Sequence, residues 1–124
     1  SYAQSWCSQR PDFVSSFYAE NGSLTVNNGT PAVGRDEISK VAESFMTAFP
    51  DIIVAMDSLV TTSEGIEFHW TFTGTNTGPN GTGQKVKISG FEFWQLDDHG
   101  LIKVSKGRFD AEEYDRQIKF GVDN

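Results

Sequence analysis

The chain has 124 residues, enough for one domain with its own hydrophobic core, and we expect a single domain over residues 1–124. Its net charge of −7 argues against partners such as nucleic acids or anionic membranes, because either would require a basic face. No apolar run approaches the length of a membrane-spanning helix, no signal-peptide pattern opens the chain, and the single cysteine, Cys7, can form no intrachain disulfide. These features predict a cytoplasmic protein.

The first fifty residues predict helices and one short strand. Tyr2 and Trp6 lie four residues apart, as on one face of a helix. Pro11 suits the start of a second helix, and Asn21-Gly22 suits its end. In chain order the predicted elements are a helix within residues 1–8, a helix over 12–20, a strand over 23–26, a loop over 27–34 and an amphipathic helix over 36–49.

The rest of the chain predicts long antiparallel strands, because apolar and polar residues alternate between turn-forming segments. Asp110 is a suitable cap for a last helix. The predicted elements are strands over 52–61, 66–75, 85–96 and 101–109 and a helix over 111–120. Helices followed by strands predict an α+β fold: a cone-shaped α+β barrel, in which a strongly curved, mostly antiparallel sheet wraps around the N-terminal helices and encloses a pocket.

Glu92 does not fit the pattern of its own strand. The even-numbered row that includes Val86, Ile88 and Trp94 is predicted to face inward, and Glu92 is the only charged residue in that row. A carboxyl group facing a core must be hydrogen-bonded, paired or protonated. Burial would raise its pKa and make Glu92 a neutral hydrogen-bond donor or general acid; the alternative is a structural glutamate bonded to a buried tyrosine, arginine or backbone amide. Arg108 on the next strand would lower that pKa if it pointed inward, and alternation leaves its direction open.

The neighbouring strand supports a pocket. Phe68, Trp70 and Phe72 share one row, which we expect to face inward with Trp70 beside Trp94 across the ladder. His69 then points outward, which favours a solvated or interface histidine over a catalytic base.

Phe91 and Phe93 flank Glu92 on the opposite face of the sheet. Two phenyl rings on an outer face need cover, which predicts a homodimer through that face; the alternative is that the C-terminal segment folds back over them. The two histidines are unrelated and no acidic residues cluster at ligand spacing, so neither a metal site nor a cofactor is expected.

Five stretches in order, spanning nearly the whole chain, resemble the nuclear transport factor 2-like superfamily, specifically its SnoaL-like branch of polyketide cyclase relatives. They are residues 17–22, 34–38, 72–79 with Thr82-Gly83, 91–100, and Arg116-Gln117. The resemblance implies the cone-shaped α+β fold, which hosts isomerases, cyclases, dehydratases, epoxide hydrolases and non-catalytic modules.

The resemblance also implies roles for individual residues. In ketosteroid isomerase a protonated aspartate and a tyrosine form an oxyanion hole, and the matching positions here look like Glu92 and Tyr2. The position of the isomerase's base looks like Val26, and the position of the acid/base aspartate of SnoaL-type cyclases looks like Gly107. Neither residue can transfer a proton, which argues against steroid isomerisation and aldol cyclisation of those types.

Two functions remain open. The first is a cofactor-free isomerase, cyclase or hydratase acting on a small, largely apolar carbonyl compound or epoxide, with Glu92 as acid or oxyanion donor and Tyr2 assisting. The second is a non-catalytic ligand-binding or dimerisation module of the same fold. In either case the ligand is expected to be a small apolar or amphipathic molecule, with Asn76 orienting it. The expected ligand-binding residues are Trp6, Phe45, Trp70, Phe72, Asn76, Trp94 and Phe109.

Overall fold

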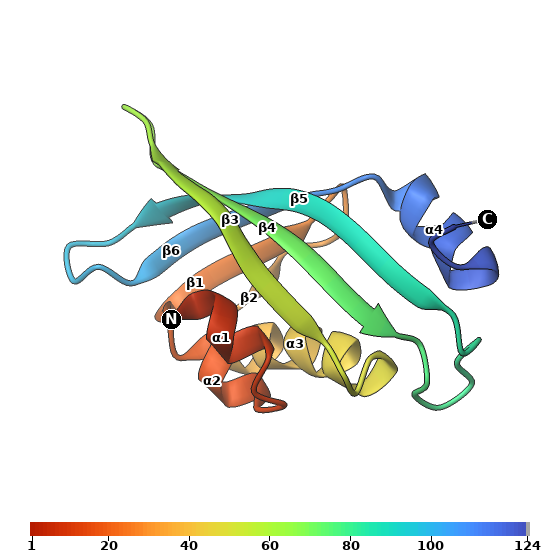
Figure 1. The fold of residues 1–124 in the computed structure, drawn as a ribbon. Helices are drawn as coiled ribbons and strands as arrows, with labels where there is room; N and C mark the ends of the chain where they lie inside the picture. Colours follow the sequence, from red (N-terminus) through yellow and green to blue (C-terminus); the bar gives the residue numbers. More distant parts are fainter. Residues whose placement is uncertain (124) are drawn as a thin grey trace.

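The computed structural model describes residues 1–123, which form a curved six-stranded sheet with helices along its concave side (Figure 1). The helices are α1 (Tyr2–Trp6), α2 (Pro11–Ser15), α3 (Arg35–Ala48) and α4 (Ala111–Phe120). The strands are β1 (Tyr18–Val26), β2 (Ala32–Val33), β3 (Ile53–Thr61), β4 (Ile66–Thr75), β5 (Lys85–Leu96) and β6 (Ile102–Arg108). None of the helices within residues 1–123 is long and apolar enough to span a membrane.

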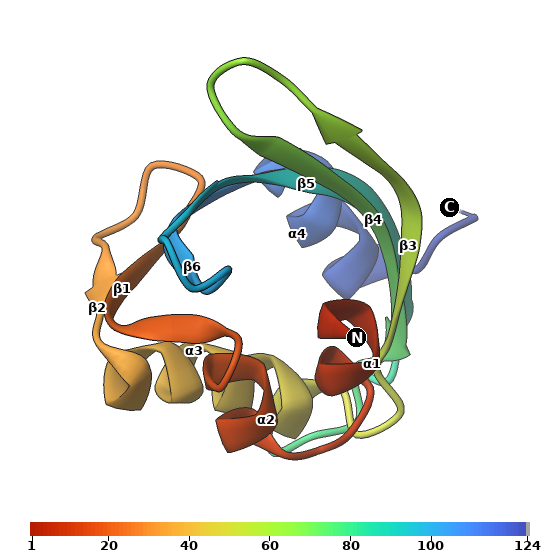
Figure 2. The same cartoon turned by 90° about the vertical axis from the view of Figure 1, so that its left-hand side faces the viewer.

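The sheet is mixed and does not close. Its strand order is β2-β1-β6-β5-β4-β3, and every neighbouring pair is antiparallel except β1 and β6, which are parallel. Figure 2 shows the sheet curving over one side of the molecule, while α1, α2 and α3 close the opposite side; Figure 1 shows α4 at one end, beside β5. The predicted α+β cone is therefore confirmed.

The predicted second helix is too long. α2 ends at Ser15, and β1 begins at Tyr18, opposite Ile102 of β6. The amide of Ile102 donates to the carbonyl oxygen of Phe17 at 2.9 Å, and the Tyr18 side chain is fully buried. Pairing with a residue 84 positions later therefore overrides the local helical pattern, an outcome that the local sequence alone does not reveal.

The predicted direction of β5 is confirmed. Ile88, Glu92 and Trp94 are buried on the concave face, whereas Phe91 and Phe93 are only partly buried and lie on the outer face.

Arg108 also lies on the outer face, because it pairs with Phe91 in the ladder. It is exposed and donates through Nη1 to Oδ1 of Asn28 at 2.9 Å. No cation from this position reaches Glu92, which leaves burial as the dominant influence on that carboxyl group.

One predicted contact is wrong. Trp70 does not lie beside Trp94, because the register places Gly90 opposite Trp70 and Ile66 opposite Trp94. Trp94 instead stacks on Phe68, with ring centroids 5.0 Å apart. The observed register of β4 against β5 differs from the expected one by four residues.

Gly90 provides a test of this packing. A Cβ atom at residue 90 would lie 2.4 Å from the carbonyl oxygen of Arg108 and 2.7 Å from Cζ2 of Trp70. We expect Gly90→Ala to lower the free energy of unfolding by about 1–3 kcal/mol, because the added methyl group overpacks the sheet. Urea denaturation measures the change.

Gly107→Ala is the matched control on the adjacent strand. A Cβ atom at residue 107 would lie 3.7 Å from Cγ of Glu92 and 3.6 Å from the carbonyl oxygen of Thr25, and both are ordinary van der Waals distances. Its stability should stay close to that of the wild type. Equal losses in the two variants would contradict the packing described for Gly90.

Candidate functional site

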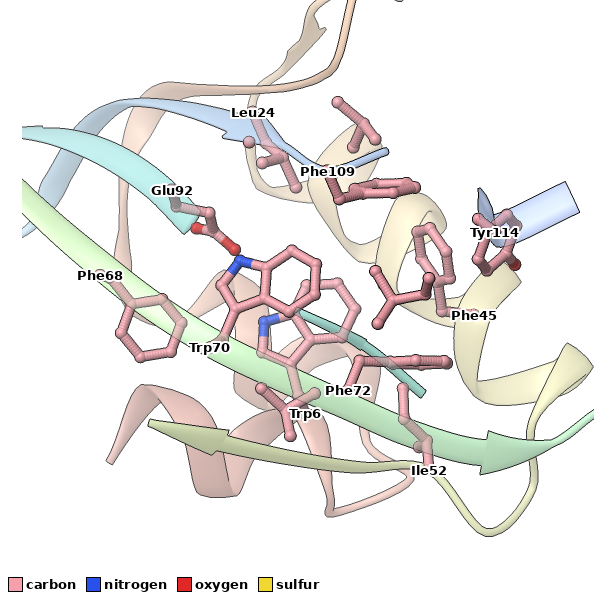
Figure 3. Close-up of a pocket in the computed structure, with 14 residues that line it drawn as sticks. Trp6, Leu24, Phe45, Ile52, Phe68, Trp70, Phe72, Glu92, Phe109 and Tyr114 are labelled. Atoms are coloured by element: carbon pink, nitrogen blue, oxygen red, sulfur yellow. The ribbon is translucent and has the colours of Figure 1, made fainter. Parts of the chain in front are cut away.

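A partly open cavity of about 70 Å³ lies on the concave face of the sheet (Figure 3). A single water needs roughly 10–15 Å³ by the same kind of measure, so the cavity can hold a small organic molecule. Its wall is mainly aromatic and aliphatic. The residues that line it are Trp6, Leu24, Val26, Phe45, Ile52, Val54, Phe68, Trp70, Phe72, Ile88, Glu92, Gly107, Phe109 and Tyr114. Among these described residues, Glu92 is the only one with a carboxyl group.

Four elements hold the Glu92 carboxyl group in place. Its Oε1 accepts hydrogen bonds from Nε1 of Trp94 at 2.9 Å, from Oγ of Ser105 at 2.8 Å and from the hydroxyl group of Tyr2 at 3.0 Å. The Tyr2 hydroxyl group also lies 3.3 Å from Oε2 and 2.8 Å from the hydroxyl group of Tyr18. Side chains from α1, β1 and β6 thus converge on one carboxyl group of β5, and they include Tyr2, the residue expected to assist Glu92.

The pKa of Glu92 is raised, because burial disfavours the charged form. The hydrogen bonds from Trp94, Ser105, Tyr2 and Tyr18 act in the opposite direction but do not outweigh burial. When Glu92 is protonated, Oε2 is the more suitable site for the proton, because Oε1 already accepts hydrogen bonds from three donors. In its neutral form Glu92 can therefore donate a hydrogen bond as well as accept them.

Both tyrosines behind Glu92 remain neutral. Burial, followed by the charge of Glu92, raises the pKa of Tyr2 and of Tyr18 well above the ordinary value for a phenol. Their hydroxyl groups therefore act as hydrogen-bond donors and acceptors and not as proton acceptors at neutral pH.

The expected site residues fall into three groups. Six of them line the cavity: Trp6, Phe45, Trp70, Phe72, Glu92 and Phe109. Tyr2 and Trp94 lie behind the Glu92 carboxyl group and donate to it.

Asn76 takes no part in the cavity wall. Its Nδ2 donates to the carbonyl oxygen of Ala48 at 3.2 Å, and its Oδ1 accepts from the amide of Thr82 at 2.9 Å. These bonds tie the loop after β4 to the end of α3, which is a structural role.

Sequence reasoning missed Tyr18 and Ser105. Tyr18 fell inside the helix that was predicted too long. Ser105 pairs with Trp94 in the ladder, so a correct register between β5 and β6 would have placed its hydroxyl group beside Glu92. Within residues 1–123, no three His, Cys, Asp or Glu residues are grouped so as to hold a metal ion.

The sequence and fold have clear relatives. The family model for SnoaL-like polyketide cyclases matches residues 1–118. No curated protein is significantly similar in sequence.

Three solved structures illustrate the similarity in fold. A Catenulispora acidiphila protein with a ketosteroid isomerase-like fold, in complex with trimethylamine, has a TM-score of 0.79 at 12% identity and covers 91% of this chain and 85% of its own. A phenazine biosynthesis-related protein from Pseudomonas aeruginosa has a TM-score of 0.79 at 15% identity, with coverage of 99% and 86%. SalBIII, described as an epoxide hydrolase/cyclase-like enzyme in pyran ring formation, has a TM-score of 0.76 at 17% identity, with coverage of 90% and 87%. At these identities the similarity establishes the fold alone.

The raised pKa of Glu92 makes a prediction about stability and pH. A raised pKa in the folded state means that folding binds protons, so the contribution of this group is fully present below its unfolded pKa and is lost as pH rises through the folded pKa. Glu92→Gln removes the ionisation and keeps the shape. We expect the free energy of unfolding of Glu92→Gln, relative to wild type, to increase between pH 4 and pH 8 by about 1.4 kcal/mol for each unit by which the pKa is raised.

Glu113→Gln is the control of opposite sign. Hydrogen bonds from Arg116 and Gln117 lower the pKa of Glu113 to about 2, so its charged form stabilises the fold above its unfolded pKa. This variant should be less stable than wild type at neutral pH, and the difference should disappear as pH falls towards 2. Urea denaturation between pH 2 and pH 8 measures the stability of both variants relative to the wild type. If the stability of Glu92→Gln relative to the wild type fell as pH rises, a raised pKa of Glu92 would be contradicted.

Proposed function

The chain belongs to the SnoaL-like polyketide cyclase family, and from that premise we propose that it binds a small, largely apolar carbonyl compound or epoxide and isomerises, cyclises or hydrates it without a cofactor. One observation carries the proposal: Glu92, with a raised pKa, is 7% exposed and lines an otherwise apolar cavity. A neutral acid in such a cavity can act on an oxygen atom of a bound molecule.

Glu92 would act where negative charge develops on that oxygen. Its proton is donated, wholly or as a hydrogen bond, to the carbonyl or epoxide oxygen as the transition state forms. In epoxide opening the C–O bond breaks as the attacking water or hydroxyl oxygen bonds to carbon, and the proton that this oxygen loses restores the Glu92 carboxyl group. The apolar wall strengthens this interaction because it excludes competing water. Tyr2, Trp94 and Ser105 act as positioning residues, since their bonds to the carboxyl group fix its rotamer before the ligand binds.

The position of Glu92 bears on the type of reaction. Gly107, which looks like the acid/base position of SnoaL-type cyclases, lies directly opposite Glu92 in the ladder. Among the described residues that line the cavity, Glu92 has no second carboxyl or imidazole group beside it. This favours reactions in which one acid is enough, such as opening of an epoxide by water or by a hydroxyl group of the same molecule. The fold similarity to SalBIII, an epoxide hydrolase/cyclase-like enzyme, supports the same choice.

The alternative is a non-catalytic ligand-binding module of the same fold. The same lack of a second acid or base among the described lining residues favours it, because binding needs only the apolar wall and one donor.

Turnover of two simple probes distinguishes these functions. Styrene oxide reports acid-assisted hydration, and 3-cyclohexen-1-one reports isomerisation to the conjugated ketone. We expect the wild type to convert at least one of them and Glu92→Gln to be inactive if the proton is transferred, or to retain part of the rate if Glu92 only donates a hydrogen bond. Glu113→Gln, with its substitution outside the cavity, should match the wild type. Saturable binding without turnover would establish the alternative, and neither binding nor turnover would contradict both functions.

We also propose that the protein is a cytoplasmic homodimer that associates through the outer face of the sheet. On this face Phe91 packs against His69, with ring centroids 5.5 Å apart, and neither Phe91 nor Phe93 is fully buried. Ile53 and Val60 of β3 lie on the same face and are 56% and 43% exposed. A second copy of this surface would cover these side chains through two-fold symmetry.

Sedimentation tests the dimer. The wild type should sediment at about twice 13.7 kDa. Phe91→Glu should give a monomer, because it places a charge in an apolar contact. Phe120→Glu makes the same exchange at a phenylalanine that is 55% exposed on α4, and it should leave the mass unchanged. A monomeric wild type at high concentration would rule out this interface.

A further inference from the structure

The indole N–H group of Trp70 is buried without a hydrogen-bond partner. Among residues 1–123, its Nε1 is the one buried side-chain nitrogen or oxygen atom in this condition. By contrast, the indole N–H group of Trp94 donates to Glu92. An unpaired buried N–H group costs roughly 1–3 kcal/mol, so Trp70 is a donor that a bound molecule could satisfy.

The Trp70 N–H group belongs to the cavity that contains Glu92. Trp70 and Glu92 line the same cavity, and they are diagonal neighbours on adjacent strands, because Phe68 lies opposite Glu92 and Gly90 lies opposite Trp70. Figure 3 shows the nitrogen-bearing edge of the Trp70 indole turned towards the Glu92 carboxyl group.

The direction of the indole ring is fixed by its surroundings. A side chain at Gly90 would collide with Cζ2 and Cη2 of Trp70, so the missing side chain allows the indole to lie against β5. Phe109 packs against the same indole, with ring centroids 5.9 Å apart. The donor is therefore held in place before any ligand arrives, which reduces the entropy lost on binding.

We propose that Trp70 and Glu92 together bind one oxygen atom of the ligand, with Trp70 selecting molecules that present a hydrogen-bond acceptor at this point. The inference rests on the proposed function, since it concerns the same cavity. An indole N–H can only donate, and neutral Glu92 donates through its own proton. Two donors suit an oxygen that only accepts, as in a ketone, an epoxide or an ether. A hydrocarbon of the same shape leaves the Trp70 donor unpaired, so the cavity discriminates against it.

Acetophenone and α-methylstyrene provide a matched pair of probes, because they differ mainly in the exchange of a carbonyl oxygen for a methylene group. The chain has three tryptophans, so a proton–nitrogen correlation spectrum of the labelled protein contains three indole signals, and Trp70→Phe identifies one of them by its loss. We expect acetophenone to move the Trp70 indole proton downfield and α-methylstyrene to leave it nearly unchanged. This measurement uses the wild-type protein and does not depend on the folding of a variant.

The affinities test the same inference. Trp70→Phe should reduce the preference for acetophenone over α-methylstyrene by about threefold to tenfold, as expected for one net hydrogen bond, and should leave the affinity for α-methylstyrene within about twofold. Phe45→Leu is the control, since it removes part of the apolar wall and should weaken both probes alike.

Each result has one meaning. An unmoved Trp70 signal, or an unchanged preference in Trp70→Phe, would overturn the role of Trp70. If the preference is then lost in Glu92→Leu, the proposed function remains. If neither probe binds saturably, the proposed apolar ligand and the inference drawn from it are both wrong.

Discussion

The burial of one carboxyl group on the concave face of the sheet is the constraint on which the site depends. Glu92 is tolerated there because Trp94, Ser105 and Tyr2 donate to it, and Tyr18 completes the network through Tyr2. These residues come from four separate elements, so the network also fixes how α1 and β1 meet β5 and β6. A polar network of this kind gives a preorganised acid without requiring the acid to be charged.

The two oxygen atoms of the Glu92 carboxyl group differ in their hydrogen bonds. Oε1 accepts hydrogen bonds from Trp94, Ser105 and Tyr2, whereas Oε2 lies 3.3 Å from the Tyr2 hydroxyl group. Oε2 therefore keeps more hydrogen-bonding capacity than Oε1. On the neighbouring strand, Trp70 adds a donor that has no described protein partner. Apart from these two groups the wall is mainly aromatic and aliphatic, so they set where a polar atom of the ligand can bind.

Much of this arrangement could be predicted from the sequence, and the parts that could not have physical causes. Alternation along β5 placed Glu92 inward and Phe91 outward, because a strand with one buried face must follow a period of two. The same pattern carries no information on which residues of adjacent strands face each other, so Trp70 was wrongly paired with Trp94. Tyr18 was missed because its strand forms only through pairing with distant β6. Asn76 lies outside the cavity wall because its side chain binds Ala48 and Thr82.

Two glycines shape the space around Glu92 and Trp70. Gly107 leaves the space opposite Glu92 open, and a Cβ there would already touch Cγ of Glu92 at 3.7 Å. A carboxyl side chain at that position would compete with Glu92 for the same space and add a second buried acid. Gly90 makes room for the Trp70 indole in the same way, since its missing side chain lets the indole lie on β5. The two glycines therefore shape the site as much as the side chains that are present. Because they leave this space free, the Glu92 carboxyl group and the Trp70 indole can both line a cavity of about 70 Å³.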